Sequence, residues 1–380
     1  MAVRATWLAC LVGACALEFA APAHGQSSRY VIADQDTMGP GGSDMRSLMV
    51  FLQAPGVQLL GVTVVAGDGW LAEETAHALR LLELLGRTDV RVYPGASVPL
   101  WRTREWTKLA GQLYGKAHWM GAWREGGPPE RSFAELPALR EGSPTTKPVE
   151  ESAAAFMVRM VHQYPHQVTI YGAGPLTNIA LAIKLDPEFP ALAQELVIMG
   201  GSILPNTQQP EWVNAPRHEF NFWWDPEAAS IVLRAPWARV SQATIDASLQ
   251  ARVYPKMMEG ILKANSAAAE YVRRYVRLPV EEGPGMYGWD ELAAIAWLDP
   301  SVIRSERYLY EDVNTERGPG YGDTLTWSDA LKPDLDLHKV HIYMDVDQPK
   351  FEAAMIRLFS APTPGARNPL ILEAAGSGSR

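Results

Sequence analysis

The 380-residue chain contains only two cysteines, Cys10 and Cys15, and both lie near its N-terminus. If that segment is removed, disulfides, thiolate nucleophiles and cysteine-ligated zinc sites are all excluded. Positive charge is also scarce, because 34 Lys and Arg face 43 Asp and Glu and the net charge is −9. A partner with a nucleic-acid backbone is therefore not expected, since binding it needs clustered Lys and Arg.

The first 25 residues have the pattern of a signal peptide. Arg4 supplies the positive start, and the apolar run at 7–17 is too short to cross a bilayer, so no stable membrane span is expected. Small residues at Ala23 and Gly25 predict cleavage before Gln26. We therefore expect an exported, periplasmic or secreted protein. A lipid anchor at Cys15 is the alternative.

Apolar strand-like and helix-like segments alternate after residue 28. This alternation predicts an α/β fold with a mostly parallel, Rossmann-like open sheet covered by helices on both faces. We expect one domain over residues 26–362 and a disordered tail at 363–380. The expected strands are 31–33, 59–66, 90–93, 167–171, 195–199 and 239–245, and the expected helices include 71–85, 176–185 and 226–234.

Residues 101–150 differ from the rest of the chain. They are polar, rich in Trp and interrupted by Pro and Gly. Long segments of this kind without regular structure are usually functional, so we interpret this one as an insertion or lid.

Three carboxylates mark the end of the first predicted strand. Asp34 and Asp36 follow its apolar residues, and Asp44 opens a predicted amphipathic helix after a Gly/Pro-rich turn. The turn allows the backbone to fold back, so the three acids can converge. They cannot all stay ionised side by side without positive charge among them. A hard, oxygen-seeking cation is the obvious candidate, although an isolated Asp-x-Asp is more often a solvated turn.

The other predicted strands also end in polar or glycine-rich segments. Each has an ordinary explanation when taken alone, such as a tight turn or, for Asp290, a helix N-cap. All of them nevertheless fall on one edge of the predicted sheet, where ligands of such sheets bind. The segments are Gly67-Asp68-Gly69, Gly172 to Asn178, Met199 to Ser202, Asn214 to Pro226, and Gly288-Trp289-Asp290.

The order of these motifs resembles the inosine-uridine-preferring nucleoside hydrolase family. Asp-x-Asp…Asp, Gly-Pro-Leu-Thr-Asn-Ile-Ala, Met-Gly-Gly, Glu-Phe-Asn and a late Asp-x-Leu-Ala follow one another within residues 31–359. The resemblance implies calcium-dependent hydrolysis of the N-glycosidic bond of a ribonucleoside or related N-riboside, by a homodimer or homotetramer. The alternative is a ribose- or nucleoside-binding protein that retains the Ca²⁺ site with little or no turnover.

The resemblance also assigns roles to single residues. Asp36 would ligate Ca²⁺ and act as general base on a metal-bound water. Asp44, Asp290 and the backbone carbonyl of Ala173 would complete the ligand set, with Asp34 in support. The predicted substrate-binding residues are Asp68, Met199, Asn214, Glu219, Asn221, His218 and Trp289.

Three positions depart from the family pattern, and the first is Asp68, which stands where the family usually has an Asn that binds ribose hydroxyls. Ser43 stands where the family usually has an acid, and Trp289 stands where it often has a histidine tied to protonation of the leaving base. Because indole cannot deliver a proton, another acid must act or the substrate must have a better leaving group. His218 is the candidate favoured by position, although a packing role is the alternative. The other candidates are His118, Tyr271, Arg274 and Tyr275.

Overall fold

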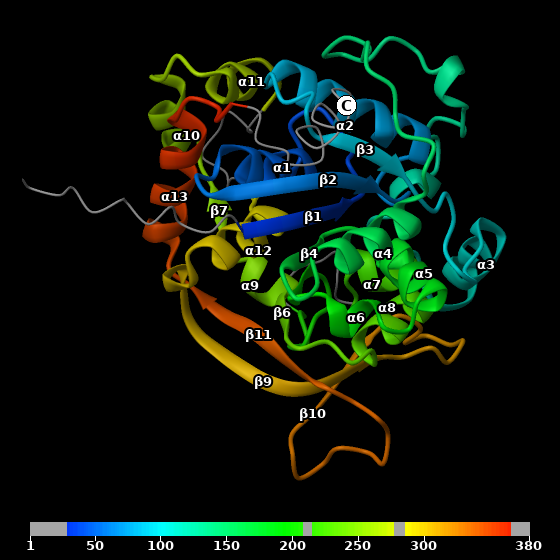
Figure 1. Ribbon diagram of the computed structural model, residues 1–380. Coiled ribbons are helices and arrows are strands. Elements are labelled where there is room, and N and C mark those ends of the chain that lie inside the picture. The colour runs from blue at the N-terminus through cyan, green and yellow to red at the C-terminus, as the bar shows by residue number, and fades with distance from the viewer. Residues whose placement is uncertain (1–28, 208–214, 277–285, 366–380) are drawn as a thin grey trace, which may run out of the picture.

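The computed structural model describes residues 29–207, 215–276 and 286–365. Its centre is a nine-stranded sheet in the order β10-β9-β11-β6-β5-β4-β1-β2-β3 (Figure 1). The strands from β11 to β3 in that order pair in parallel, and β9 pairs antiparallel with both β10 and β11. The predicted mostly parallel α/β sheet is confirmed. The strands are β1 Arg29–Gln35, β2 Val57–Val64, β3 Arg91–Pro94, β4 Val168–Gly172, β5 Glu195–Met199, β6 Val240–Ala243, β9 Ile303–Val313, β10 Thr324–Trp327 and β11 Lys339–Val346.

Strand β1 shows why both faces of the sheet are covered. Val31 and Ala33 pack in the hydrophobic core on one face, and Ile32 packs in the core on the other. Successive side chains of a strand point to opposite faces, so an uninterrupted apolar strand needs a helical layer on each side. Strand β5 repeats the pattern with Val197 and Ile198.

Two helical layers supply that cover (Figure 1). Within the described residues, no helix is long and apolar enough to cross a membrane. One layer contains α1 Ser43–Gln53, α2 Leu71–Leu84, α9 Ile245–Ser248, α10 Pro255–Leu262, α11 Ala267–Tyr275, α12 Trp289–Leu298 and α13 Gln348–Ser360. The other contains α4 Ala153–Gln163, α5 Thr177–Leu185, α6 Phe189–Leu192 and α8 Pro226–Leu233. Beside these layers lie α7 Phe220–Trp224, the turn η3 Pro300–Val302 and the small sheet of β7 Arg252–Val253 with β8 Met286–Tyr287.

Most predicted elements are present, with shifted ends. The predicted strand 195–199 coincides with β5, whereas the predicted strands 59–66 and 239–245 run past the ends of β2 and β6. The buried residues beyond those ends belong to loops or, for Ile245, to the start of α9, and an apolar pattern alone does not distinguish these from strand. The prediction that the helix opened by Asp44 is amphipathic is wrong, because every residue of α1 is buried. Contacts with β2, α12 and α13 surround it.

The insertion at 101–150 has more structure than its composition predicts. It contains α3 Arg104–Tyr114 and the 3-10 turns η1 Gly121–Trp123 and η2 Phe133–Glu135. Thr103 caps α3 by accepting a hydrogen bond from the Trp106 amide at 3.1 Å. The Ala122 amide donates to the Gly67 carbonyl at 2.9 Å, so the insertion is attached to the loop that follows β2.

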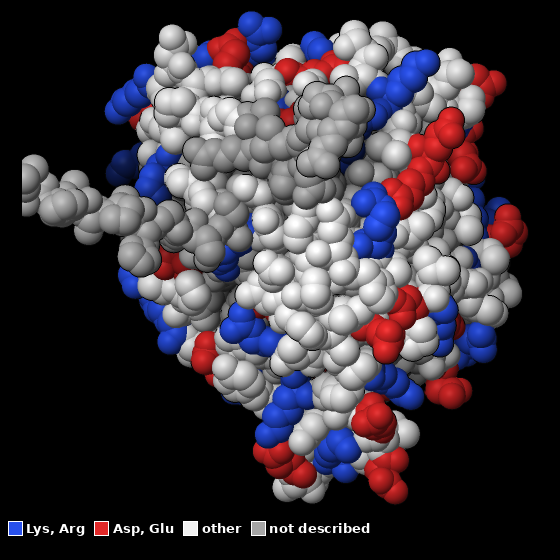
Figure 2. Space-filling view, viewed as in Figure 1, with Lys and Arg blue, Asp and Glu red and all other residues white. Residues whose placement is uncertain are grey.

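The charged side chains are interleaved on the face shown in Figure 2. Blue and red groups alternate around a largely uncharged centre, so neither sign dominates this face. The predicted signal peptide and residues 366–380 of the predicted tail lie outside the described residues.

Candidate active site

A cavity of about 710 Å³ opens at the carboxyl edge of the parallel strands. It lies beyond β1, β2, β4 and β5, where the sheet geometry predicted a ligand site. Asp34 is buried and does not line it, and Asn214 lies outside the described residues. The predicted residues that line the cavity are Asp36, Asp44, Asp68, Ala173, Met199, His218, Glu219, Asn221, Trp289 and Asp290.

The Asp36 carboxylate lies between two glycines, Gly67 and Gly174. A Cβ atom at Gly67 would lie 2.2 Å from its Oδ2, and one at Gly174 would lie 2.7 Å from its Oδ1. The Asp68 amide donates to Oδ2 at 3.0 Å. Burial raises the pKa of Asp36 well above its ordinary value, and the neighbouring carboxylates of Asp68 and Asp44 raise it further. This carboxylate therefore favours either a proton or a nearby cation.

Asp44 and Asp290 come from the first turns of two helices, α1 and α12. The Met38 amide donates to Asp44 Oδ2 at 3.1 Å, and Gln35 Nε2 donates to Asp290 Oδ2 at 2.8 Å. Burial, reinforced by neighbouring acids, raises the pKa of both carboxylates well above the ordinary value. Asp290 is not the N-cap of α12, since that position is Gly288 and no side chain caps the helix.

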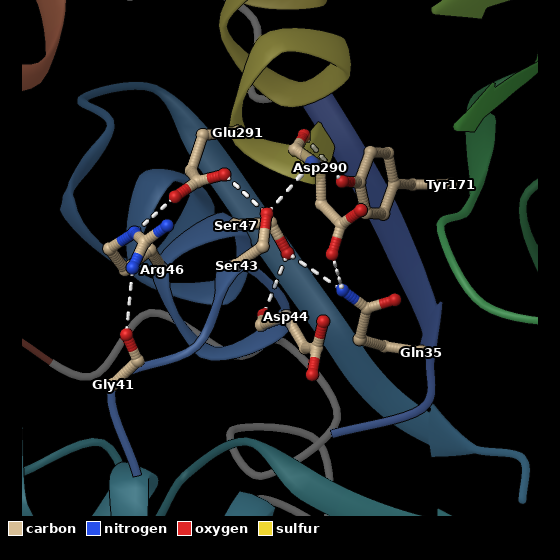
Figure 3. Close-up of polar contacts among 9 residues, drawn as sticks. All are labelled: Gln35, Gly41, Ser43, Asp44, Arg46, Ser47, Tyr171, Asp290 and Glu291. Atoms are coloured by element: carbon tan, nitrogen blue, oxygen red, sulfur yellow. Dashed lines mark hydrogen bonds and ion pairs between the residues drawn. The ribbon is translucent and has the colours of Figure 1, made fainter. Parts of the chain in front are cut away.

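A fully buried ion pair between Arg46 and Glu291 lies beside Asp44 and Asp290 (Figure 3). Ser43 Oγ donates to Glu291 Oε2 at 2.5 Å and accepts a hydrogen bond from the Asp290 amide at 3.0 Å. Arg46 Nη1 donates to the Gly41 carbonyl at 2.7 Å. These contacts join the start of α1 to the start of α12, and Ser43, one of the departures from the family pattern, lies at the junction.

Further hydrogen bonds connect the same two helices to the sheet (Figure 3). Gln35 Nε2 also donates to Ser47 Oγ at 3.1 Å, and the Tyr171 hydroxyl donates to the Asp290 carbonyl at 2.8 Å. Sequence reasoning missed Gln35, Arg46, Tyr171 and Glu291. The sequence offered a signal for three of them: Gln35 lies between two acids, Arg46 lies within the apolar repeat of α1, and Glu291 is a second acid beside Asp290.

Glu219 and Asn221, which also line the cavity, are held by hydrogen bonds to the backbone. Glu219 accepts hydrogen bonds from the amides of Gly201 and Asn221, both at 2.9 Å, and from that of Phe222 at 3.0 Å. Asn221 Nδ2 donates to the Met199 carbonyl at 3.0 Å. Burial raises the pKa of Glu219. Phe222, between these residues and α8, is fully buried in the core.

Asp34 supports the floor of the cavity. Its Oδ1 accepts hydrogen bonds from Thr63 Oγ1 at 2.6 Å and Asn178 Nδ2 at 2.8 Å. Burial raises the pKa of Asp34 to about 7 despite these bonds. Asn178 Oδ1 accepts from the Ala96 amide at 2.8 Å, so this buried pair connects β1 and the start of α5 to the loop after β3.

The insertion supplies part of the cavity wall. His118 and Trp119 line it, and Trp119 Nε1 donates to Asp68 Oδ1. Burial raises the pKa of Asp68 to about 6, although the bond from Trp119 acts in the opposite direction. Sequence reasoning predicted an insertion or lid here but did not connect it with Asp68.

Of the five predicted leaving-group acids, His118 and His218 line the cavity, whereas Tyr271, Arg274 and Tyr275 do not. Burial, aided by the positive charge of Arg102, lowers the pKa of His218 to about 3, so its imidazole is neutral at pH 7. Tyr271 is buried in the core, and Arg274 forms an exposed ion pair with Glu270. His118 remains, because it lines the cavity.

The donor atoms fit a hard divalent cation. Asp36, Asp44, Asp290 and Ala173 all line the cavity, and their carboxylate and carbonyl oxygens are the ligands that Ca²⁺ prefers. The glycines beside Asp36 leave room around its carboxylate. Within the described ranges, no three His, Cys, Asp or Glu side chains surround one point closely enough to form a complete ligand set. A cation here would therefore need the backbone carbonyl, the substrate or water as further ligands.

The model of the family described as inosine-uridine preferring nucleoside hydrolase matches residues 31–353. A probable uridine nucleosidase 2 from Arabidopsis thaliana is 30% identical over 281 residues, which cover 72% of this chain and 79% of the relative. The pyrimidine-specific ribonucleoside hydrolase RihA from Salmonella newport (strain SL254) is 32% identical over 321 residues, covering 82% of this chain and 93% of the relative.

Solved structures show the same fold. The plant nucleoside hydrolase PpNRh1 aligns with a TM-score of 0.66 at 23% identity, covering 88% of this chain and 99% of that one. A purine-preferring ribonucleoside hydrolase from Gardnerella vaginalis also aligns with a TM-score of 0.66, at 22% identity, covering 87% and 98%. The match of the family model over most of the chain, with relatives of this identity and coverage, shows that the chain belongs to the inosine-uridine preferring nucleoside hydrolases, a family of N-glycosidases.

Proposed function

We propose that this protein is a calcium-dependent hydrolase of the N-glycosidic bond of a ribonucleoside or a related N-riboside. The observation that carries the proposal is that Asp36, Asp44 and Asp290 line one cavity together with Glu219 and Asn221. The names of the relatives, a uridine nucleosidase and a pyrimidine-specific ribonucleoside hydrolase, support a nucleoside substrate.

The side chains suit this chemistry. Cleavage of the C1′–N bond develops positive charge on the ribose, and buried carboxylates stabilise that charge. Asp36 removes a proton from the attacking water, a task for which a raised pKa is an advantage. The Asp68 amide holds Oδ2 of Asp36, which leaves Oδ1 to accept the proton. When bound, Ca²⁺ would be held by Asp36, Asp44, Asp290 and the Ala173 carbonyl, and would acidify water and bind the ribose diol.

Removal of calcium is the first test. A chelator should reduce the release of reducing sugar from a panel of nucleosides by at least about a hundredfold, and added Ca²⁺ should restore it. The same reducing-sugar assay measures the loss of activity with chelator and its recovery with Ca²⁺. Mg²⁺ added in place of Ca²⁺ is the control, because Mg²⁺ requires stricter octahedral geometry. Calcium-dependent ribose binding without any turnover would instead favour the alternative of a binding protein.

The second test concerns Trp289, which lines the cavity where the family often has a proton donor. Replacing Trp289 by His should raise the turnover of nucleosides by about tenfold or more, because the imidazole can protonate the departing base. An aryl riboside whose phenolate leaves unaided should gain little. Trp289→Phe is the matched control, since it changes the ring without adding an acid. An equal gain for both substrates, or for both variants, would show that the change acts through cavity shape.

A further inference from the structure

A second cavity of about 710 Å³ is lined mainly by α3 and residues 115–126 of the insertion. It shares no lining residue with the candidate active site. Its wall includes the apolar side chains of Met120 and Trp123 and, on α7, Trp223. Cavities of this size are typical of small-molecule sites.

Arg102, in the wall of this cavity, is a buried cation without a matched anion. Arg102 is only 3% exposed to solvent. The guanidinium carbon lies 4.5 Å from the ring centre of Trp223 and 4.4 Å from that of Tyr321. Nη2 donates a long hydrogen bond of 3.5 Å to the Tyr321 carbonyl, and Nε has no partner among the described residues. Burying a charge in this state is costly unless a counter-charge is present.

The acids nearest to Arg102 are engaged elsewhere. Asp225 accepts hydrogen bonds from the Leu100 amide at 2.8 Å and from Thr177 Oγ1 at 2.7 Å. Glu227 accepts from the Tyr321 hydroxyl at 2.6 Å. Both carboxylates act on Arg102 only through space. The protein itself therefore leaves a position for an anion beside this guanidinium.

The other charged side chains that line the cavity also carry a net positive charge. Arg104, Lys108 and Lys116 add three positive charges to that of Arg102, whereas Glu105 and Glu125 are the only acids that line the cavity within the described residues. The cavity thus has two surplus positive charges, four minus two, on a chain whose net charge is −9. Thr107 is also buried, and its Oγ1 has no partner among the described residues.

We propose that this cavity binds a phosphomonoester with a small organic group. A phosphate monoester carries a charge of about −1.5 to −2 at pH 7, which matches the surplus. The arginine fork and a free hydroxyl suit phosphate oxygens. The organic part packs against Met120 and Trp123. Inorganic phosphate alone would leave most of the volume unfilled.

Calorimetric titration of the full chain with phenyl phosphate tests the proposal, because this probe has no ribose to occupy the candidate active site. We expect saturable binding of phenyl phosphate and weaker binding of inorganic phosphate. Lys108→Glu should weaken binding by roughly tenfold. Glu125→Gln should tighten it several-fold, because Lys116 then loses its 2.8 Å ion pair with Glu125. Lys256→Glu, on α10, is the charge-matched control and should bind like the wild type.

Arg102→Met tests the buried cation directly and should abolish binding, with circular dichroism to confirm folding. If this variant does not fold, the pair Lys108→Glu and Lys256→Glu decides the question. Absence of phenyl phosphate binding would overturn the proposal, and so would equal binding by those two variants. Binding of a nucleoside 5′-monophosphate without any binding of phenyl phosphate would also overturn it, because the ligand would then be in the ribose cavity.

Discussion

Replacing Asp36 by Asn should lower nucleoside hydrolysis by at least about a thousandfold while the protein stays folded. The side chain keeps its size between Gly67 and Gly174, and the Asp68 amide can still donate to the amide oxygen. The variant cannot accept the proton of the attacking water, and a positioned base is worth about 10²–10⁴-fold. It also loses a cation ligand, which adds to the effect. Initial rates of sugar release and thermal unfolding measure the two outcomes.

Asp68→Asn is the matched control for Asp36→Asn, because it removes one negative charge from the same cavity. The family usually has Asn at this position, so we expect activity within about tenfold of the wild type, well below the effect of a lost base. Retained activity in Asp36→Asn would show that another base acts. Equal losses in both variants would show that net charge in the cavity, and not the position of Asp36, controls the rate.

Replacing Arg46 by Met should lower the free energy of unfolding by about 3–5 kcal/mol, because Glu291 would remain as a buried and unpaired charge. Both side chains of the pair are fully buried, so solvent cannot compensate for the loss. Ser43 still donates to Glu291, and this single hydrogen bond does not replace the ionic partner. Urea denaturation followed by circular dichroism measures the change.

The double variant Arg46→Met/Glu291→Leu separates stability from positioning. It should recover most of the lost stability, because an apolar pair of similar volume replaces the buried ions. Its activity should nevertheless fall below that of the wild type, since Ser43 loses the Glu291 carboxylate that orients it against the Asp290 amide. A single variant within about 1 kcal/mol of the wild type would contradict the assumption that the pair remains ionised.

The sheet could be predicted because its strands are uninterrupted apolar runs that end in polar loops. Strand β5 matched the expected bounds, and the carboxyl edge where Asp36 and Asp68 meet follows from the parallel topology. Helix α1 shows the limit of such reasoning. Its apolar repeat predicts one buried face, but Arg46 is also buried because its partner Glu291 comes from a helix 245 positions later.

The interior of the insertion was beyond prediction for the same reason. Composition marked residues 101–150 as different, whereas the position of Trp119 beside Asp68 depends on a contact across 51 positions. The burial of Arg102 depends on rings from three segments, which no local pattern connects. Long-range polar contacts of this kind decide the details of the cavities, and they leave no periodic signal in the sequence.

Gln35 and Ser43 each form a hydrogen bond with Asp290, at the start of α12. These two bonds affect the order in which the folding chain can become active. The members of each pair are separated by 255 and 247 positions, so these contacts form only when distant parts of the chain meet. Contacts between remote segments are slow to close. A chain emerging from the ribosome can therefore assemble β1 to β6 and still be inert until α12 docks. Hydrolysis would thus report the docking of α12 and not the formation of the central strands.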